Sequence, residues 1–110
     1  MSGSSNTESF GTFSSNETAC DSLVLDTQLA SPKEAVVDLI QVGDVLDVAL
    51  GNANGLVTVE VLRNGQVAGG VASPNIQRLL TCMKQNTVYA ATVYEKIGGQ
   101  VKIRISPIGN

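Results

Sequence analysis

The adjacent residues Asn64 and Gly65 constrain this chain more than any other feature. The segments on either side, residues 56–63 and 66–72, alternate apolar and polar side chains, as half-buried strands do. Both central residues of a tight hairpin turn need a positive φ, which asparagine and glycine tolerate best. The sequence therefore predicts an antiparallel hairpin at this point and a fold built largely on strands.

Gly65, Gly69 and Gly70 precede an expected helix, so this segment could also be taken for a phosphate-binding loop. A Walker-type loop needs a lysine directly after its last glycine, and a dinucleotide-binding loop needs Gly-x-Gly-x-x-Gly; this segment has neither. The chain has no histidine, which excludes histidine-based acid–base catalysis. We predict that these glycines shape the backbone and that the protein is not an enzyme.

Further strands and two helices are expected around this hairpin. Alternating apolar residues predict strands over residues 22–29, 44–50, 87–96 and 101–108, and residues 51–55 form a turn cluster. Ser31 and Ser73 are each followed by proline, which predicts two helix starts with a serine cap. In the second helix, Leu79 and Leu80 belong to an apolar stripe that we expect in the core.

The expected order is strand, helix, three strands, helix and two strands. It predicts a mainly β fold with two short helices (α+β), arranged as a small, partly open β-barrel of about six strands. Residues 1–19 are rich in Ser, Thr, Asn and Gly and are predicted to be disordered, because they offer little apolar surface to bury. Their alternative role is a docking peptide anchored by Phe10 and Phe13. Residues 20–110 are predicted to be one domain.

Cys20 and Cys82 are the only cysteines. The N-terminus lacks a basic patch followed by an apolar stretch, so we expect no signal peptide and a cytoplasmic location, where thiols stay reduced. Two unpaired cysteines are therefore predicted. With no Cys-x-x-Cys pair and no histidine, we expect no metal and no cofactor. Apolar runs are too short to span a bilayer, so no membrane partner is expected.

Acidic and basic residues are distributed unevenly along the chain. Up to Glu60 there are nine acidic residues and one basic residue, and from Val61 onward there are one acidic and six basic residues, for a net charge of −3. Lys102 and Arg104 alternate with apolar residues, so both should point out of the barrel. A basic face beside a tyrosine is typical of a surface on which single-stranded nucleic acid stacks.

This hypothesis assigns nucleic-acid binding to six residues: Arg63, Arg78, Lys102, Arg104, Tyr89 and Tyr94. The alternative is an ordinary solvated strand face whose basic residues balance the acidic half of the chain. Three carboxylates that are close in sequence, Asp38, Asp44 and Asp47, are expected to be solvated surface groups.

From about Leu39 to Ile108, the order of features resembles the HIRAN domain. The resemblance rests on "VGDVLDV" at residues 42–48, "LVTVEV" at residues 56–61 and "NGQVAGGVA" at residues 64–72, followed by an amphipathic helix. That family is a small β-barrel with helices, found alone in bacteria and fused to DNA-remodelling enzymes elsewhere, and it grips single-stranded DNA ends. Gly70 and Val71 stand where the family often has an aromatic residue.

The sequence thus predicts a non-enzymatic binding module. The resemblance implies recognition of single-stranded DNA or DNA ends. The alternative is a protein-interaction module without nucleic-acid binding, which would use an exposed strand edge or the N-terminal tail.

Overall fold

The structure is a computed structural model that describes residues 19–108. Of the tail predicted to be disordered, residues 1–18 lie outside the described residues, as do residues 109–110. The described part contains one short 3-10 helix, two α-helices and six strands. None of the helices in residues 19–108 is long and apolar enough to cross a membrane.

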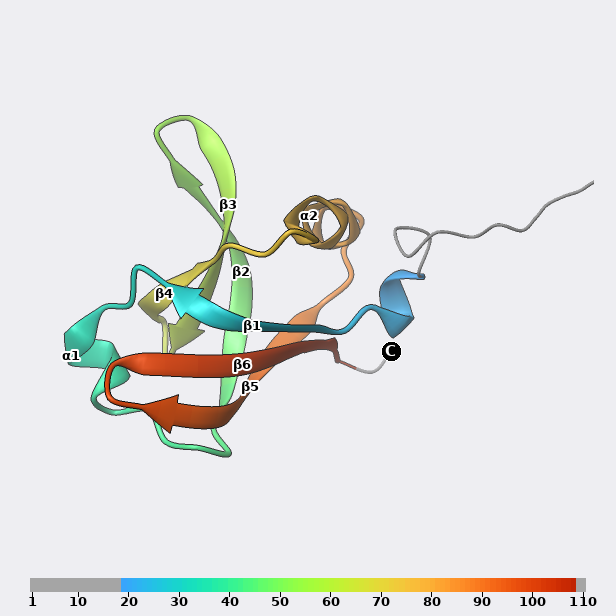
Figure 1. The fold of residues 1–110 in the computed structure, drawn as a ribbon. Helices are drawn as coiled ribbons and strands as arrows, with labels where there is room; N and C mark the ends of the chain where they lie inside the picture. Colours follow the sequence, from blue (N-terminus) through green and yellow to red (C-terminus); the bar gives the residue numbers. More distant parts are fainter. Residues whose placement is uncertain (1–18, 109–110) are drawn as a thin grey trace, which may run out of the picture.

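Six antiparallel strands form a closed ring. They are β1 (Leu25–Ala30), β2 (Val45–Ala53), β3 (Leu56–Arg63), β4 (Gln66–Val71), β5 (Tyr89–Ile97) and β6 (Gln100–Pro107). Around the ring the order is β1-β4-β3-β2-β5-β6, and β6 pairs with β1 to close it (Figure 1). The predicted fold class and order of elements are confirmed.

Two of the hairpins turn on an Asn-Gly pair. Between β3 and β4, Asn64 and Gly65 have φ values of 52° and 83°, as predicted for such a turn. Between β2 and β3, Asn54 and Gly55 have nearly the same values, 54° and 83°. The turn expected over residues 51–55 is therefore confined to two residues, and β2 continues to Ala53. This extra length lets the hairpin of β2 and β3 extend beyond the segments that pair with β5 and β4.

Helices α1 (Glu34–Val37) and α2 (Ile76–Lys84) begin later than predicted. Ser31 has a φ of 47° and caps no helix; the backbone N–H of Lys33 donates to the Ala68 carbonyl, which ties the chain to β4 before the helix begins. Ser73 accepts a hydrogen bond from the N–H of Asn75, which forms a local turn ahead of α2. Both serine caps were wrong, because a non-helical turn separates each serine–proline pair from its helix, so that Lys33 and Asn75 occupy the cap positions.

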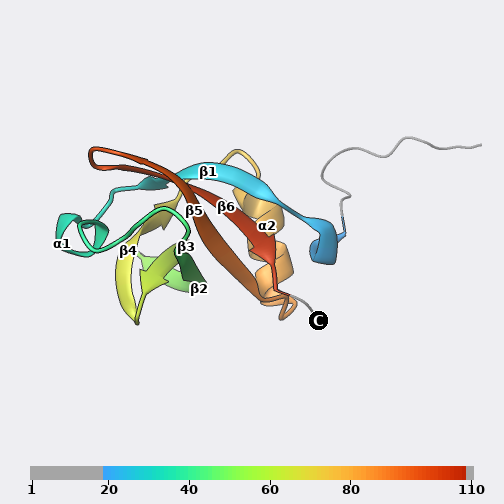
Figure 2. The same cartoon turned by 90° about the horizontal axis from the view of Figure 1, so that it is seen from below.

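The two helices lie at opposite ends of the barrel (Figures 1 and 2). Helix α1 is held by Lys96 of β5, whose ammonium group donates to the carbonyls of Val37 and Ile40 at 2.9 Å each. A cation at the last carbonyls of a helix is the favourable position for it. Helix α2 buries Leu79 and Leu80 in the core, as its apolar stripe predicted.

Inward-facing residues of the strands and α2 fill the barrel. Ile103 and Ile105 of β6 are fully buried, while Lys102 and Arg104 between them face outward, as the alternation predicted. No polar or charged residue of the described chain is buried. The interior is therefore a packed apolar core, and any binding site lies on the outer surface.

Candidate functional site

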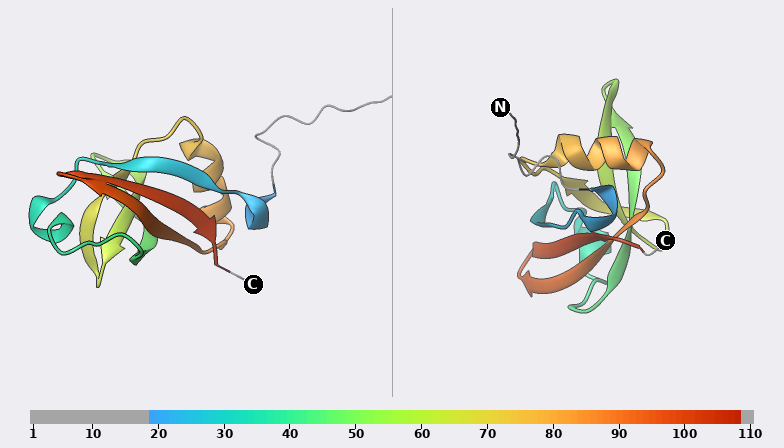
Figure 3. Two further views of the ribbon diagram at one scale, coloured as in Figure 1. Left: turned by 60° about the horizontal axis from the view of Figure 1, so that its bottom comes forward. Right: turned by 90° about the vertical axis from the view of Figure 1, so that its right-hand side faces the viewer.

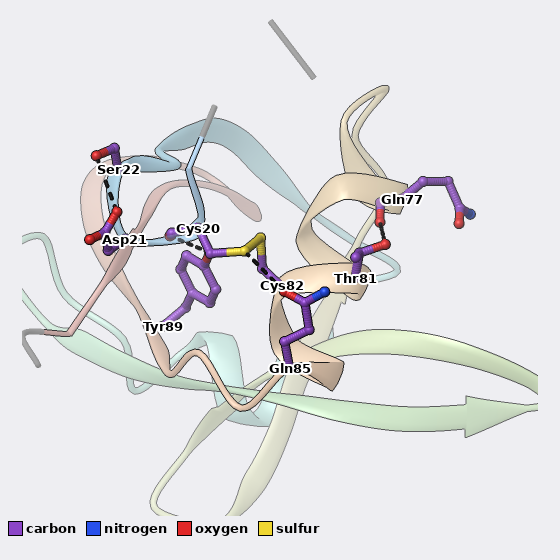
Figure 4. Close-up of a disulfide and its surroundings, with 8 residues drawn as sticks. All are labelled: Cys20, Asp21, Ser22, Gln77, Thr81, Cys82, Gln85 and Tyr89. Carbon is purple, nitrogen blue, oxygen red and sulfur yellow. Dashed lines mark hydrogen bonds between the residues drawn. A yellow bond between two sulfur atoms is a disulfide. The ribbon is translucent and has the colours of Figure 1, made fainter. Parts of the chain in front are cut away.

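Cys20 and Cys82 form a disulfide, so the prediction of unpaired cysteines was wrong (Figure 4). The bond joins the 3-10 helix η2 (Cys20–Ser22) to α2, and the two Cα atoms are 5.4 Å apart. The prediction relied on a presumed reducing compartment. The two cysteines are 62 residues apart in sequence, and this separation does not indicate a disulfide. The three-dimensional fold brings η2 and α2 together.

Tyr89 bonds to the 3-10 helix beside the disulfide, and its ring is inaccessible to a ligand. Its side chain is 1% exposed, and its hydroxyl donates to the Cys20 carbonyl at 2.7 Å (Figure 4). Burial raises the pKa of the Tyr89 hydroxyl, because the phenolate would lose its hydration. A ring enclosed in this way offers no face to a base, so Tyr89 is removed from the predicted stacking residues.

Lys102 and Arg104 lie on the outer face of β6, but acidic neighbours already engage both. The Arg104 guanidinium donates to both carboxylate oxygens of Asp26 on β1, at 2.7 and 3.1 Å. This pairing holds the pKa of the Asp26 carboxyl below its usual value. Lys102 forms an ion pair with Glu95 of β5 at 3.7 Å. The predicted basic strand is locally close to neutral.

Tyr94 is the exposed tyrosine, and it lies beside Arg104. The register of β5 against β6 shifts between Val93 and Glu95, which leaves Tyr94 at a bulge with 41% of its surface exposed. The guanidinium carbon of Arg104 lies 5.3 Å from the centre of its ring, within range for a cation–π contact. We call Asp26, Tyr94 and Arg104 the Arg104 cluster.

The structure does not gather all four predicted basic residues on one face. Arg63 is on β3, which is three strands away from β6 in either direction around the ring. It lines a polar surface depression of about 380 Å³ together with Asp44 and Asp47. Arg78 is on α2, at one end of the barrel, where it is half-buried. The six predicted residues are therefore not one nucleic-acid surface.

A second candidate surface, which the sequence analysis missed, is the long hairpin of β2 and β3. Only Val45, Leu46 and Asp47 of β2 pair with β5, and β4 pairs with β3 only from Glu60 onward. Residues 48–59, which we call the arm, extend beyond these points, and the tip of the arm projects from the barrel (Figures 1 and 3). At its base, Val59 is buried in the core and Val48 packs against the core. Across the arm, β2 and β3 pair with each other down to Ala53 and Leu56.

The outer strand edges of the arm are unpaired. Within residues 19–108, no ladder joins residues 56–59 to a strand other than β2, or residues 48–53 to a strand other than β3. Leu56 is 70% exposed, the highest value among the large hydrophobic residues that the structure describes, and Leu50 and Val57 are each 42% exposed. An exposed apolar strand edge is a site at which another extended chain can bind as an additional strand.

The arm also lacks the features that usually protect such an edge. Residues 48–59 contain no charged residue and no proline. Natural edge strands are commonly protected by lysine, proline, a bulge or a covering loop. A run of twelve uncharged residues was visible in the sequence. It was divided between a strand, a turn and a second strand, so it was not recognised as one projecting unit.

A pocket lies at the base of the arm, where β4 leaves β3. It has a volume of about 320 Å³, and we call it the foot pocket. Its lining includes Lys33, Thr58, Glu60, Gly70 and Val71. Glu60 packs its carboxylate against Gly51, where no side chain competes for the space. Gly70, paired opposite Glu60, leaves the adjoining space open because it also lacks a side chain.

No candidate metal centre appears in the described part of the chain. Among residues 19–108, no three His, Cys, Asp or Glu side chains are grouped so that they could hold a metal ion. The candidate sites are thus an apolar strand edge and a small cluster of charged and aromatic side chains. Comparisons with family models, with curated proteins and with solved structures found no match for this chain.

Proposed function

We propose that this domain is a non-enzymatic protein-binding module that captures an extended polypeptide segment on the free edge of β3. The observation that carries the proposal is the arm, whose residues 56–59 have an open main-chain edge. In an antiparallel pair, every second residue presents both its N–H and its C=O to the neighbouring strand. Four residues therefore offer roughly four main-chain hydrogen bonds to an added strand.

The side chains of the arm favour a partner of low charge. The exposed leucines and Val57 can cover apolar side chains of the added strand, and no charge in residues 48–59 attracts a polyanion. Affinity would come mainly from main-chain hydrogen bonds, and specificity from alternate side chains. This is the protein-interaction alternative that the sequence analysis left open.

Selection from a random 12-residue peptide library tests the proposal. Peptides that bind the wild-type protein should bind a Leu56→Lys, Val57→Lys variant at least tenfold more weakly, because lysines on an edge strand oppose strand addition. The control is Ile97→Lys, which adds a lysine at a site that is 61% exposed and remote from the arm. Peptides that bind all three proteins equally, or a library without binders, would contradict the proposal.

The second candidate function is binding of single-stranded nucleic acid, as the HIRAN resemblance implies. The observation that favours it is the Arg104 cluster, where an exposed tyrosine and a guanidinium share the outer face of the barrel. Bases can stack on such a pair, and phosphates could displace Asp26 from Arg104. The two cations of this face, Lys102 and Arg104, would give a logarithmic salt slope of about −1.4 once phosphates replace their acidic partners.

A fluorescence titration with labelled oligothymidine at several salt concentrations tests this second candidate. Asp26→Ala should strengthen binding, because it releases Arg104 for phosphate contact. Lys102→Ser with Arg104→Ser should remove the salt dependence. If the oligonucleotide binds equally to wild type and to both of these variants, or to none of them, the Arg104 cluster is not a nucleic-acid site.

The compartment in which the module works stays a prediction. The expectation of a cytoplasmic location rested on the missing signal-peptide pattern, and free cysteines were inferred from that location, whereas Cys20 and Cys82 are paired in the structure. Structural disulfides are usual in oxidising compartments and uncommon in the cytosol. We therefore regard a module that binds its partner in an oxidising environment as the alternative to a cytoplasmic one.

A further inference from the structure

We infer that the arm fits a second copy of this chain, with the Leu56 side chain of each copy seated in the foot pocket of the other. The inference deepens the proposed function and rests on it, because it uses the same free edge of β3. Leu56 protrudes from the arm, and the foot pocket lies two residues further along the same face of β3, beside Thr58. One chain thus carries both an apolar side chain and a place to receive it.

A two-fold axis through Val57 brings these features together. In an antiparallel pairing of two β3 edges, Val57 then lies opposite Val57 of the second copy, and Leu56 lies opposite Thr58 of that copy. Residues directly opposite in an antiparallel pair point to the same face, so Leu56 is directed towards the pocket beside Thr58. The relation is reciprocal, as an isologous contact requires.

Electrostatics permits this arrangement. The nearest charged residue of β3 is Glu60, which lies beyond the paired segment and whose carboxylate packs over Gly51. Lys33 and Glu60 at the pocket have opposite charges. Because residues 48–59 are uncharged, pairing one arm with another places no like charges opposite each other.

The register limits the length of this contact. The second copy runs antiparallel, so its barrel lies beyond the tip of the first arm and not against the first barrel. Gly55 of the second copy comes opposite Val59, beside which β4 ends at Val71, so the pairing is confined to residues 56–58 of each edge. The overlap involves few residues, at the low end of interface sizes, so association should be weak and should depend on concentration.

Two variants alter the contact from its two sides. Leu56→Lys removes the inserted side chain. Gly70→Val fills the pocket, and the fold should tolerate it, because a Cβ at Gly70 would meet only the carbonyl oxygens of Val59 and Ala30, at 3.6 and 4.0 Å. Gly69 is unsuitable, since its Cβ would lie 2.9 Å from the Ala30 carbonyl oxygen.

Sedimentation equilibrium of the chain over roughly 0.01–1 mM tests the inference, a range suited to weak association. The wild type should move from monomer towards dimer, and each variant should remain monomeric. The controls Ile97→Lys and Gly99→Val should dimerise as the wild type does; no atom lies within 4 Å of a Cβ at Gly99. A mixture of the Leu56→Lys and Gly70→Val variants should associate more weakly than wild type, because it retains one leucine and one open pocket.

The outcomes separate this inference from the proposed function. A wild type that is monomeric at 1 mM but binds library-selected peptides through the arm would overturn the second copy as occupant and leave the proposed function intact. A dimer that persists in both variants would overturn the inference by placing the interface elsewhere. A monomer without peptide binders would overturn both.

Discussion

At the scale of single residues, partners on other strands determine what each charged or aromatic side chain can do. Lys102 and Arg104 face outward as their alternation predicted, but their acidic partners lie on β1 and β5. Arg104 and Asp26 are far apart in sequence, and they become neighbours only because β6 pairs with β1. The sequence alone therefore did not indicate this ion pair. Alternation can predict the face on which a residue lies, but it cannot predict the neighbour across the strand.

The pairing of Asp26 with Arg104 predicts a pH effect. The Asp26 pKa is lowered by the hydrogen bond from Arg104, so the folded state binds this proton less readily than the unfolded state does. The stabilisation is therefore present above the ordinary aspartate pKa and is lost as the pH falls through the lower folded-state pKa.

Carbon-detected NMR of the aspartate carboxyl groups measures this effect. The pKa of Asp26 should lie below the ordinary aspartate value of 3.8 in the wild type and return towards that value in Arg104→Gln. An Asp26 titration that is the same in both proteins would show that the pair does not persist in solution.

At the scale of elements, the two helices show what periodicity can and cannot predict. The stripe in α2 was located correctly, because spacing at three and four residues identifies the buried face of a helix. The start of α1 was wrong, because Lys33 bonds to Ala68 of β4, a contact that local sequence does not encode, and the start of α2 was wrong, because Ser73 forms a turn with Asn75 ahead of the helix. The length of the β2–β3 hairpin was also missed, since its Asn54–Gly55 turn lies within a longer run of turn-forming residues.

Helix α2 should contribute strongly to stability through Leu79, which is 0% exposed. Leu79→Ala should lower the free energy of unfolding by about 2–5 kcal/mol, because it removes buried apolar surface and leaves a cavity. Gln77→Ala on the exposed face of the same helix is the matched control and should change it by less than about 0.5 kcal/mol. Urea denaturation measures both; equal effects would mean that α2 does not pack as described.

At the scale of the whole molecule, the disulfide joins the start of the domain to the helix that closes one end of the barrel. The bond links residues that are 62 apart in sequence, so it restricts the unfolded chain over more than half of the domain. Loop-closure entropy for a link of this length is worth about 4 kcal/mol. The cysteine count could be read from the sequence, but the pairing depended on the closed fold.

A variant with Cys20→Ala and Cys82→Ala should therefore unfold at a clearly lower urea concentration than the oxidised wild type. The loss in unfolding free energy should be about 4 kcal/mol, and the reduced wild type should behave similarly. If the oxidised and reduced proteins unfold at the same midpoint, the disulfide is not part of the folded protein in solution.

The central claim is that the free edge of β3 is where this molecule binds a partner. Residue-resolved amide hydrogen exchange tests it most directly, with the protein at 10 µM or below to keep the chain monomeric, with and without a saturating library-selected peptide. We predict that the edge-facing amides within residues 56–59 exchange rapidly in the free protein and become at least tenfold more protected with peptide, while residues 101–107 are unchanged. Protection confined to the outer face of β6, or no change in residues 56–59 despite saturation, would contradict the claim.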